Sequence, residues 1–387
     1  MKTLNVAIIG TKFMGKAHSN AWLNTPRFFD LPVKPVLKVA CGQNAAGAQA
    51  FAERWGWEET ATDWRQVVAR DDVDIVDISA PTDLHHDIAV AAAQAGKHIF
   101  CEKPFALTVE EAQGMYAAAQ EAGIVHYLNH NYRRVPAVRL AKHLIEEGKI
   151  GRIFHWRGTY LQDWIVDPNF PLTWHLRADR AGAGPQYDLN SHMVDMARYL
   201  VGEINAVTAM TATFIKERPL PGAGAATFTA GAGGGAEMGK VTVDDAAFML
   251  AEFENGALGS FEASRFAPGR KNFGYFEIYG SNGSLVFNLE RMNELQLFQR
   301  ADPAYAQGFR TILATEGGQH DYISAWWPPG HMIGYEHEFH HAVVDFLQAI
   351  ADGAQVEPNF YDGLREIEIL SAGLKSAETG MKMETKA

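Results

Sequence analysis

The stretch that decides the fold of this chain reads Leu4-Asn5-Val6-Ala7-Ile8-Ile9-Gly10-Thr11-Lys12-Phe13-Met14-Gly15. Its first half is a nearly continuous apolar run, as expected of a strand buried on both faces of a parallel sheet. A turn follows and opens a helical pattern, as in the dinucleotide fingerprint G-x-G-x-x-G. Gly10 and Gly15 take its first and last glycine positions, whereas Lys12 stands at the second. The order predicts a helix N-terminus that can receive a pyrophosphate. A plain strand–helix turn is the alternative.

Short apolar runs and helical patterns continue to alternate through the first third of the chain. This β-α-β order predicts a doubly wound parallel sheet with helices on both faces. The predicted strands are 4–9, 36–41, 74–79, 97–101 and 124–128, and the predicted helices are 45–55, 63–69, 83–95 and 109–122.

From about Asn131 the pattern changes to aromatic and β-branched strands separated by glycine turns, which predicts a largely antiparallel sheet. A stretch rich in Gly and Ala, 219–239, is predicted to be a mobile excursion between strands. The predicted strands are 153–161, 206–215, 245–253, 258–266, 273–279, 284–288 and 294–298, and the predicted helices are 135–147, 186–200, 335–350 and 361–379.

Composition limits the class of protein. At 387 residues the chain is long enough for two domains, and its formal charge of -12 argues against nucleic acid or an anionic membrane as a partner. Cys41 and Cys101 are its two cysteines, too few for a disulfide framework. The N-terminal apolar run is too short for a signal peptide, so we expect a cytoplasmic protein.

A reactive lysine is predicted where the strand 97–101 ends. The tripeptide Glu102-Lys103-Pro104 follows that strand, and ligands of open parallel sheets bind outside the carboxyl ends of the strands. Lys103 can reach a reacting group there, and Pro104 can aim it through an unusual backbone.

A second candidate for catalysis is the pair Asp188 and His192. Their spacing of four residues places them on one face of the predicted helix 186–200. A carboxylate beside an imidazole suits proton abstraction from a hydroxyl. An ordinary surface pair is the alternative.

Aromatic and cationic side chains crowd the middle of the chain. Such side chains offer apolar faces and forked donors to sugar rings, although a core or a subunit contact is the alternative. They are Tyr132, Arg133, Tyr160, Trp164, Trp174, His175 and Arg177.

The segment His337-Glu338-Phe339-His340-His341 matches the H-E-x-x-H pattern of zinc proteases. Its helix also has the amphipathic spacing of an ordinary packed helix. We therefore predict no metal site and interpret the segment as a solvated or interface histidine cluster, with zinc hydrolysis as the alternative.

The adenine-ribose position is less informative. The fingerprint normally continues with an acidic residue after the second strand, but the segment 35–44 contains no Asp, Glu or Arg. NAD and NADP therefore both remain possible, with a slight preference for NAD.

Together these residues resemble the Gfo/Idh/MocA family of nicotinamide-dependent oxidoreductases. The resemblance extends over nearly the whole chain and departs from the pattern at Lys12 and at the missing acidic residue. The matching motifs are Phe13-Met14-Gly15-x-x-His18, Pro81-Thr82-x-x-His85, Glu102-Lys103-Pro104, Asn131-Tyr132-Arg133 and Asp188-x-x-x-His192.

The resemblance implies a Rossmann domain over 1–128 and an α/β domain with a large open, mainly antiparallel sheet over 129–387. The last helix would pack back on the first domain. The second domain would bind substrate and form a homodimer or homotetramer through its sheet.

The resemblance also implies hydride transfer between nicotinamide and a ring hydroxyl of a sugar, anhydro sugar, glycoside or cyclitol. The alternatives are a redox-neutral glycosidase or epimerase with retained NAD, and a non-catalytic ligand-binding regulator. Its implied catalytic residues are Lys103, which stabilises developing charge, His192, which takes the proton, and Asp188, which positions the substrate or His192.

The remaining implied site residues belong to two groups. The cofactor would be bound by Gly10, Lys12, Phe13, Met14, Gly15, Ser79, Pro81, Thr82, His85, Glu102 and Lys103. The substrate would be bound by Lys103, Tyr132, Arg133, Trp164, Trp174, Arg177, Asp188, His192 and His331.

Overall fold

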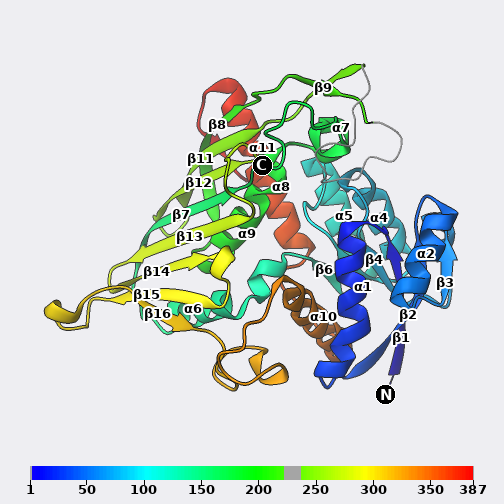
Figure 1. Cartoon of the computed structure of the whole chain (residues 1–387), viewed down its shortest axis with the longest axis horizontal. Coiled ribbons are helices and arrows are strands. Elements are labelled where there is room, and N and C mark those ends of the chain that lie inside the picture. The colour runs from blue at the N-terminus through cyan, green and yellow to red at the C-terminus, as the bar shows by residue number, and fades with distance from the viewer. Residues whose placement is uncertain (1, 222–236, 387) are drawn as a thin grey trace. The chain divides into compact units, whose positions relative to one another are not determined.

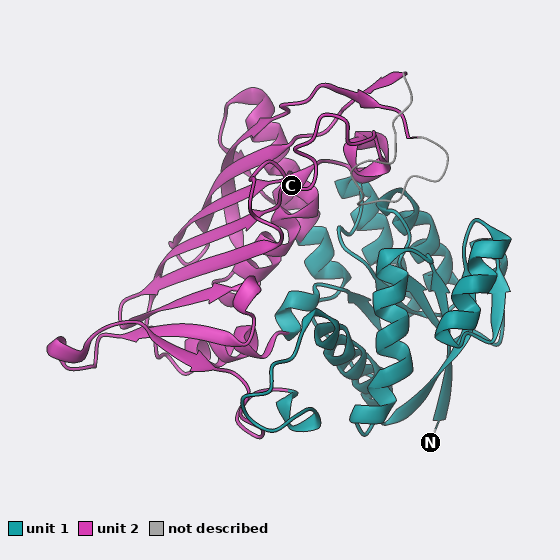
Figure 2. Ribbon diagram, viewed as in Figure 1, with its two compact units in different colours: residues 1–134, 322–365 teal, residues 135–321, 366–387 magenta. Residues whose placement is uncertain are grey.

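The computed structural model describes residues 2–221 and 237–386, and the chain divides into two compact units (Figures 1 and 2). Unit 1 comprises residues 1–134 and 322–365, and unit 2 comprises residues 135–321 and 366–387. This division differs from the predicted boundary at 128/129, because a late segment returns to the first unit. Most of the predicted mobile excursion, 222–236, lies outside the described residues.

Unit 1 contains the predicted Rossmann sheet. Its strand order is β3-β2-β1-β4-β5-β6, and every neighbouring pair is parallel. The order reverses between β1 and β4, which is where such sheets bind ligands. The sequence did not predict the three-residue β3. The strands are β1 (Lys2–Ile9), β2 (Val33–Cys41), β3 (Glu59–Ala61), β4 (Ile75–Ile78), β5 (His98–Cys101) and β6 (His126–Leu128).

Two helices of unit 1, α2 and α5, begin at residues whose side chains cap them. Asn44 and Thr108 accept hydrogen bonds from the first turns of α2 and α5, and Gly123 ends α5 in the left-handed conformation. The helical segments are α1 (Phe13–Phe28), α2 (Ala45–Trp55), α3 (Trp64–Val68), η1 (Thr82–Leu84), α4 (His85–Gln94), α5 (Val109–Ala122), η2 (Asn131–Arg134), η6 (Ile323–Ala325) and α10 (Tyr335–Asp352).

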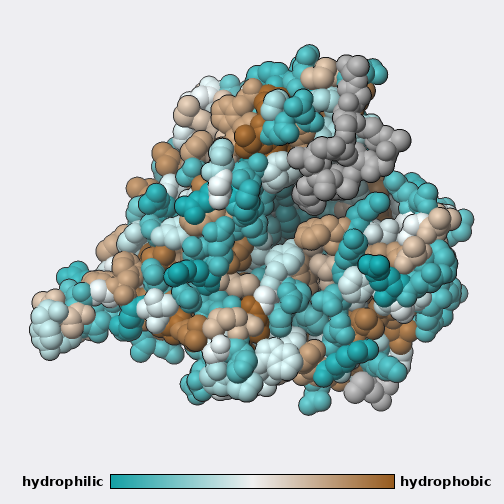
Figure 3. All heavy atoms as spheres, viewed as in Figure 1, coloured by the Kyte–Doolittle hydropathy of each residue, from teal (hydrophilic) through white to brown (hydrophobic). Residues whose placement is uncertain are grey.

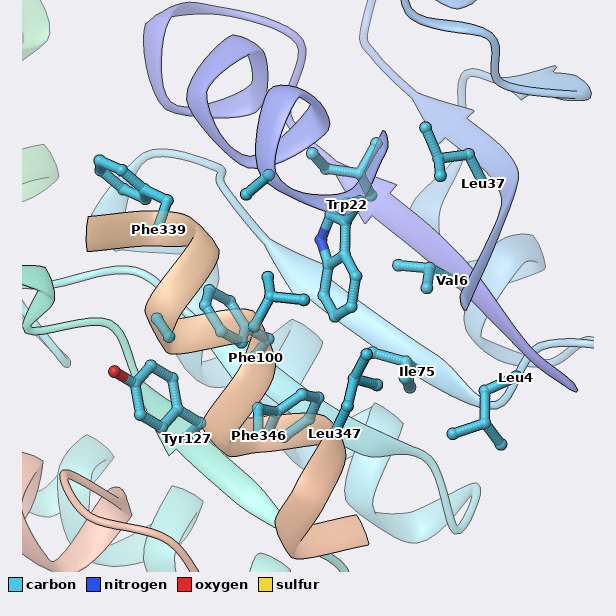
Figure 4. Packing of buried hydrophobic residues seen from close by; sticks show 14 of the residues in the cluster. Leu4, Val6, Trp22, Leu37, Ile75, Phe100, Tyr127, Phe339, Phe346 and Leu347 are labelled. Atoms are coloured by element: carbon cyan, nitrogen blue, oxygen red, sulfur yellow. The ribbon is translucent and has the colours of Figure 1, made fainter. Parts of the chain in front are cut away.

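Helix α10 belongs to unit 1 because its apolar face completes the core of that unit (Figure 4). The Phe346 ring lies 5.4 Å from the Phe100 ring of β5 and 6.4 Å from the Trp22 ring of α1. Phe339 and Leu347 join the same buried cluster. Full burial of each such side chain contributes roughly 1.5–3 kcal/mol, which explains why this late segment packs with the first sheet.

Unit 2 contains the predicted antiparallel sheet. Its order is β16-β15-β14-β13-β7-β12-β11-β8-β17, and the pair β7–β12 is parallel. The fold class predicted from the sequence is therefore confirmed. The strands are β7 (Ile153–Leu161), β8 (Ile204–Ala212), β11 (Ala246–Phe253), β12 (Leu258–Ser264), β13 (Phe273–Gly280), β14 (Gly283–Asn288), β15 (Glu294–Gln299), β16 (Arg310–Leu313) and β17 (Met383–Glu384), with a separate hairpin of β9 (Glu217–Pro219) and β10 (Met238–Lys240).

The helix predicted over 186–200 is wrong in one respect, because the structure divides it at Leu189. Asp188 is the last residue of α8, and His192 lies in the first turn of α9. Unit 2 contains five other complete helical segments among the described residues, and their bounds are given with those of α8 and α9. The bounds are α6 (Pro136–Glu146), η3 (Trp174–Leu176), α7 (Ala178–Ala181), α8 (Pro185–Asp188), α9 (Asn190–Leu200), η4 (Leu289–Arg291) and η5 (Ala304–Ala306).

The last helix, α11 (Phe360–Thr379), crosses the division between the units after Arg365. Within unit 1, the ring of its first residue, Phe360, lies 4.7 Å from that of Phe105. Among the described residues, no helix is long and apolar enough to cross a membrane.

Candidate active site

The glycine turn after β1 requires glycine at two positions. Gly10 has a φ of 120°, and a Cβ atom there would lie 2.2 Å from the Ser79 carbonyl oxygen at the end of β4. A Cβ atom on Gly15 would lie 2.2 Å from the Gly10 carbonyl oxygen. Both contacts are too short for any side chain. The turn and α1 can therefore approach the ends of β1 and β4 closely, as a dinucleotide turn must.

Lys12 fits this turn although it replaces the usual second glycine. It is the N-cap residue of α1 with a φ of -95°, so its backbone has no need of the left-handed region that favours glycine. Its side chain does not cap the helix, and the first turn contains no acidic residue. The helix N-terminus thus presents N–H groups and a lysine charge, which suit a pyrophosphate.

The next two residues, Phe13 and Met14, open helix α1. Phe13 is about half exposed, and its ring stacks at 6.4 Å from Tyr335 of α10 within unit 1. Met14 is partly buried and packs against the hydrophobic core of this unit. Phe13 therefore offers an apolar surface beside the turn.

Ser79, Pro81, Thr82 and His85 follow β4 in the chain, and Ser79 lies against the glycine turn. The Ser79 hydroxyl donates to Asp77 Oδ1 at 2.9 Å, and Thr82 is buried. Pro81 precedes the 3₁₀ turn η1, of which Thr82 is the first residue.

The His85 ring is buried, and its two nitrogens lie 2.9 Å and 3.2 Å from the carbonyl oxygens of Ala80 and Phe105. Burial lowers the pKa of His85. These contacts fasten the ends of β4 and β5 together, so the ring supports the predicted cofactor site through the backbone.

Glu102 lies in a buried charge network. His18 Nε2 is 2.7 Å from Glu102 Oε1, and His18 Nδ1 is 2.8 Å from Asp77 Oδ1. Asn129 Nδ2 donates to Glu102 Oε1 at 2.6 Å, and Trp22 Nε1 donates to Asp77 Oδ2 at 2.6 Å. The network thus joins α1 to the carboxyl ends of β4, β5 and β6.

Electrostatics keep this network charged. Burial alone would lower the pKa of His18, but the two carboxylates outweigh burial and raise it to about 10. Burial opposes ionisation of Glu102, but His18 and Asn129 more than offset it and lower its pKa. His18 is therefore a cation at neutral pH and holds both carboxylates in place.

Lys103 follows Glu102 directly at the end of β5, as predicted. Its backbone N–H donates to Glu102 Oε2 at 3.2 Å, and its peptide bond to Pro104 is cis. The lysine is partly buried. The charge network thus holds the backbone from which this side chain extends.

In unit 2, Asp188 forms an ion pair that the sequence did not predict. Arg265 Nη2 donates to Asp188 Oδ2 at 2.7 Å, and the arginine is buried whereas the aspartate is partly exposed. His192 is 5% exposed, and its ring lies 5.6 Å from that of Tyr160 on β7. The only signal for Arg265 in the sequence was a charged residue near the end of the strand predicted over 258–266.

Three of the predicted aromatic residues of unit 2, namely Trp164, Trp174 and His175, lie together between β7 and α7. The Trp164 ring packs edge-on at 5.7 Å from His175, and Trp174 stacks on His175 at 3.7 Å. Arg177 is about half exposed and pairs with Asp179 at 2.6 Å. The loop therefore joins aromatic faces to an accessible guanidinium.

Besides Lys103, three predicted substrate residues lie in unit 1. Tyr132 and Arg133 are buried in η2, and Arg133 Nη2 pairs with Asp362 at 3.2 Å. His331 is exposed, and its Nδ1 lies 2.9 Å from the Pro328 carbonyl oxygen. Their contact with substrate stays a prediction.

The H-E-x-x-H segment has the geometry of a packed helix. His341 Nε2 accepts from Trp326 Nε1 at 2.8 Å, and His341 Nδ1 lies 2.9 Å from the Arg134 carbonyl oxygen. Both nitrogens are thus already engaged. Burial raises the pKa of Glu338 well above its usual range, and its Oε2 accepts a hydrogen bond from Asn131 Nδ2 at 2.6 Å. Within the described residues, no group of side chains is arranged to hold a metal ion.

A parallel sheet with this glycine turn is the framework of dinucleotide-dependent oxidoreductases. The chain belongs to the Gfo/Idh/MocA family. Residues 4–130 match the oxidoreductase family model with an NAD-binding Rossmann fold, and residues 138–286 match the GFO/IDH/MocA C-terminal domain. The predicted enzyme class and nicotinamide cofactor are thereby confirmed.

Relatives of known identity resemble this chain over its whole length. Levoglucosan dehydrogenase from Pseudarthrobacter phenanthrenivorans is 48% identical over 379 residues, which cover 97% of each chain. A solved structure of levoglucosan dehydrogenase with NADH and levoglucosan is 46% identical, with a TM-score of 0.93 and full coverage of both chains. An oxidoreductase domain protein from Kribbella flavida is 48% identical, with a TM-score of 0.94 and the same coverage.

Proposed function

We propose that this protein is an NAD-dependent dehydrogenase that oxidises a ring hydroxyl of an anhydro sugar or related pyranose. Levoglucosan is the first substrate to test. The observation that carries this proposal is the 48% identity to levoglucosan dehydrogenase across 97% of both chains. The aromatic loop with Trp164 and Trp174 supports it, because flat apolar faces suit sugar rings.

Lys103, Asp188 and His192 are proposed to act in one reaction. His192 takes the hydroxyl proton as the carbinol carbon loses its hydride, and the product is a ketone. Lys103 donates a hydrogen bond to the oxygen on which negative charge develops. Asp188 accepts a hydrogen bond from the substrate and fixes its orientation. A nicotinamide held by unit 1 would supply the hydride acceptor.

NAD is proposed over NADP because of the loop that follows β2. Its residues Gly42, Gln43 and Asn44 carry no positive charge, which a 2′-phosphate would require. The Asn44 side chain already accepts the Gly47 N–H at 2.8 Å. A ribose with free hydroxyls fits such neutral surroundings better.

The test is a matrix of initial rates, measured as NADH or NADPH absorbance, with levoglucosan, glucose, L-sorbose and inositols. We expect the highest kcat/KM with levoglucosan and NAD. A cyclitol preference would correct the substrate, and a preference for NADP would correct the cofactor. Binding of NADH without turnover of any sugar or cyclitol would contradict the enzymatic proposal.

We also propose a homo-oligomer formed through the open face of the second sheet. That face exposes large apolar side chains from neighbouring strands, namely Met210, Phe248, Leu250 and Leu258. Hydrophobic side chains appear among hydrophilic ones on the visible surface of unit 2 in Figure 3. Clustered exposed apolar groups of this kind mark association surfaces.

Light scattering after gel filtration tests this proposal. Wild type should be a dimer or larger, and Phe248→Arg together with Leu250→Glu should yield a monomer. A monomeric wild type would contradict the proposal.

A further inference from the structure

Arg265 lies where three segments of unit 2 that carry predicted substrate residues meet. It follows the last residue of β12 and is 0% exposed. Its Nη2 donates to Asp188 Oδ2 at 2.7 Å, and its Nη1 lies 3.4 Å from the His175 carbonyl oxygen. Its Cζ atom lies 5.2 Å from the centroid of the Trp164 ring. One guanidinium thus contacts the end of α8, the η3 turn and the Trp164 loop.

The two members of the ion pair differ in accessibility. The Arg265 side chain is 1% exposed, whereas the Asp188 side chain is 27% exposed. A buried cation paired with a partly open carboxylate favours the ionised form of that carboxylate and restricts its direction. The exposed part of the Asp188 carboxylate is therefore the part to which a substrate hydroxyl could donate a hydrogen bond.

The segment before Asp188 is also held in place. Asp244 accepts the backbone N–H groups of Gly184 and Gln186 at 2.7 and 2.9 Å. A Cβ atom on Gly184 would lie 1.8 Å from the Asp244 carbonyl oxygen, so this approach admits only glycine. Asp244 thus holds the backbone of α8, and Arg265 contacts the Asp188 side chain itself.

We propose that Arg265 is a positioning residue for the dehydrogenase reaction. It couples the aromatic loop to Asp188 and holds Asp188 as an ionised hydrogen-bond acceptor for a substrate hydroxyl, which leaves proton transfer to His192. The inference rests on the proposed function, in which Asp188 contacts the substrate. Arg265 itself acts through Asp188 and through the loop.

Arg218 provides a matched control, because it holds the same loop without contacting Asp188. This buried arginine donates to the Ile165 and Asp167 carbonyl oxygens at 2.5 and 2.8 Å. Removing its charge should loosen the loop and mainly raise KM. Removing the charge of Arg265 should also disturb Asp188 and therefore lower kcat.

The experiment compares Arg265→Met, Arg265→Lys and Arg218→Met, with NADH binding to confirm a folded unit 1 and circular dichroism to confirm the sheet of unit 2. We expect Arg265→Met to lower kcat about 10- to 100-fold, the effect of losing one charge-assisted hydrogen bond. The acidic limb of its pH profile of kcat/KM should move to higher pH, and Arg265→Lys should largely restore both. Arg218→Met should keep the wild-type pH profile. If Arg265→Met does not fold, Arg265→Gln carries the same test, again with Arg265→Lys as the variant that keeps the charge.

Other ionisable groups could produce an acidic limb, namely Asp244 and Asp245, which interact electrostatically with Arg265; His175, whose carbonyl oxygen Arg265 contacts; and the proposed base His192. The double variant Arg265→Met/Asp188→Asn separates them from Asp188. If Arg265 acts through Asp188, Arg265→Met should lower kcat only slightly further in a protein that already carries Asp188→Asn. An equal loss in both backgrounds, or an unmoved acidic limb in Arg265→Met, would overturn the inference. Wild-type turnover in Asp188→Asn alone would instead contradict the proposed function.

Discussion

Each unit buries a cation beside an aspartate, but the exposed fraction of the carboxylate side chains differs between the two units. In unit 1, His18 lies between Asp77 and Glu102, and all three side chains are almost fully buried. In unit 2, Arg265 is equally buried, but Asp188 is partly exposed. A fully enclosed charge can only support its surroundings, whereas a partly open one can also contact a substrate. The comparison predicts loss of stability from changes in the first cluster and loss of turnover from changes in the second.

The largest effect is expected for His18→Leu. Removing the cation leaves two buried carboxylates without a charged partner, and breaking a buried pair in this way costs about 3–5 kcal/mol. Urea denaturation followed by circular dichroism measures the change in the free energy of unfolding.

His86→Gln is the control for His18→Leu, because His86 is exposed enough that its ion pair with Asp87 should contribute less than about 1 kcal/mol. If His18→Leu lowers the free energy of unfolding by less than about 1 kcal/mol, the enclosed cluster is not structural and the comparison between the two units is wrong.

The pH dependence of stability tests whether the positive charge of His18 stabilises the enclosed cluster. The folded pKa of His18 is raised from 6.5 to about 10 by Asp77 and Glu102, which outweigh burial. A raised folded pKa means that the stabilisation is complete below pH 6.5 and is lost as the pH rises through about 10. The urea midpoint of wild type should therefore exceed that of His18→Gln at neutral pH, and the gap should narrow toward pH 10. A constant gap would mean that His18 is neutral in the folded protein.

Variants of the proposed catalytic residues should lose turnover without a comparable loss of stability. Lys103→Met and His192→Ala should each lower kcat about 10²-fold or more, the usual effect of losing a positioned proton-transfer or charge-stabilising group. NADH affinity, measured by fluorescence titration, should be largely retained.

Lys97→Met is the control for Lys103→Met, because Lys97 precedes the other end of β5 and donates to the Arg70 carbonyl oxygen at 2.7 Å. Its turnover should match that of wild type. Near-normal turnover in Lys103→Met or His192→Ala would remove that residue from the proposed reaction.

The same comparison explains what could be predicted from the sequence. The residues of local motifs, such as Gly10, Gly15 and Lys103, were found because strand–turn–helix order places them at the ends of parallel strands. The pair of Asp188 with Arg265 was missed because 77 residues separate the partners, and no local pattern encodes such a contact. The break at Leu189 was missed because its backbone remains close to helical, with φ -103° and ψ -46°. Helix α10 was assigned to the second domain because sequence order does not reveal which sheet its apolar face covers.

The smallest effect is expected for variants of Lys12, which change the affinity for NADH. Lys12 differs from both clusters because its charge lies at the surface. Its negative φ means that glycine would bring no backbone advantage, so Lys12→Gly and Lys12→Ala should behave alike. A cation at a helix N-terminus that binds a pyrophosphate contributes through the phosphate charge, and an exposed pair is worth about 0.2–1 kcal/mol. NADH affinity should thus fall about 2- to 5-fold in low salt, and the difference from wild type should vanish in high salt because exposed charges are screened. Lys16→Ala, one helical turn further along α1, should leave the affinity unchanged. Tighter binding in Lys12→Gly than in wild type would mean that the lysine side chain crowds the pyrophosphate instead of attracting it.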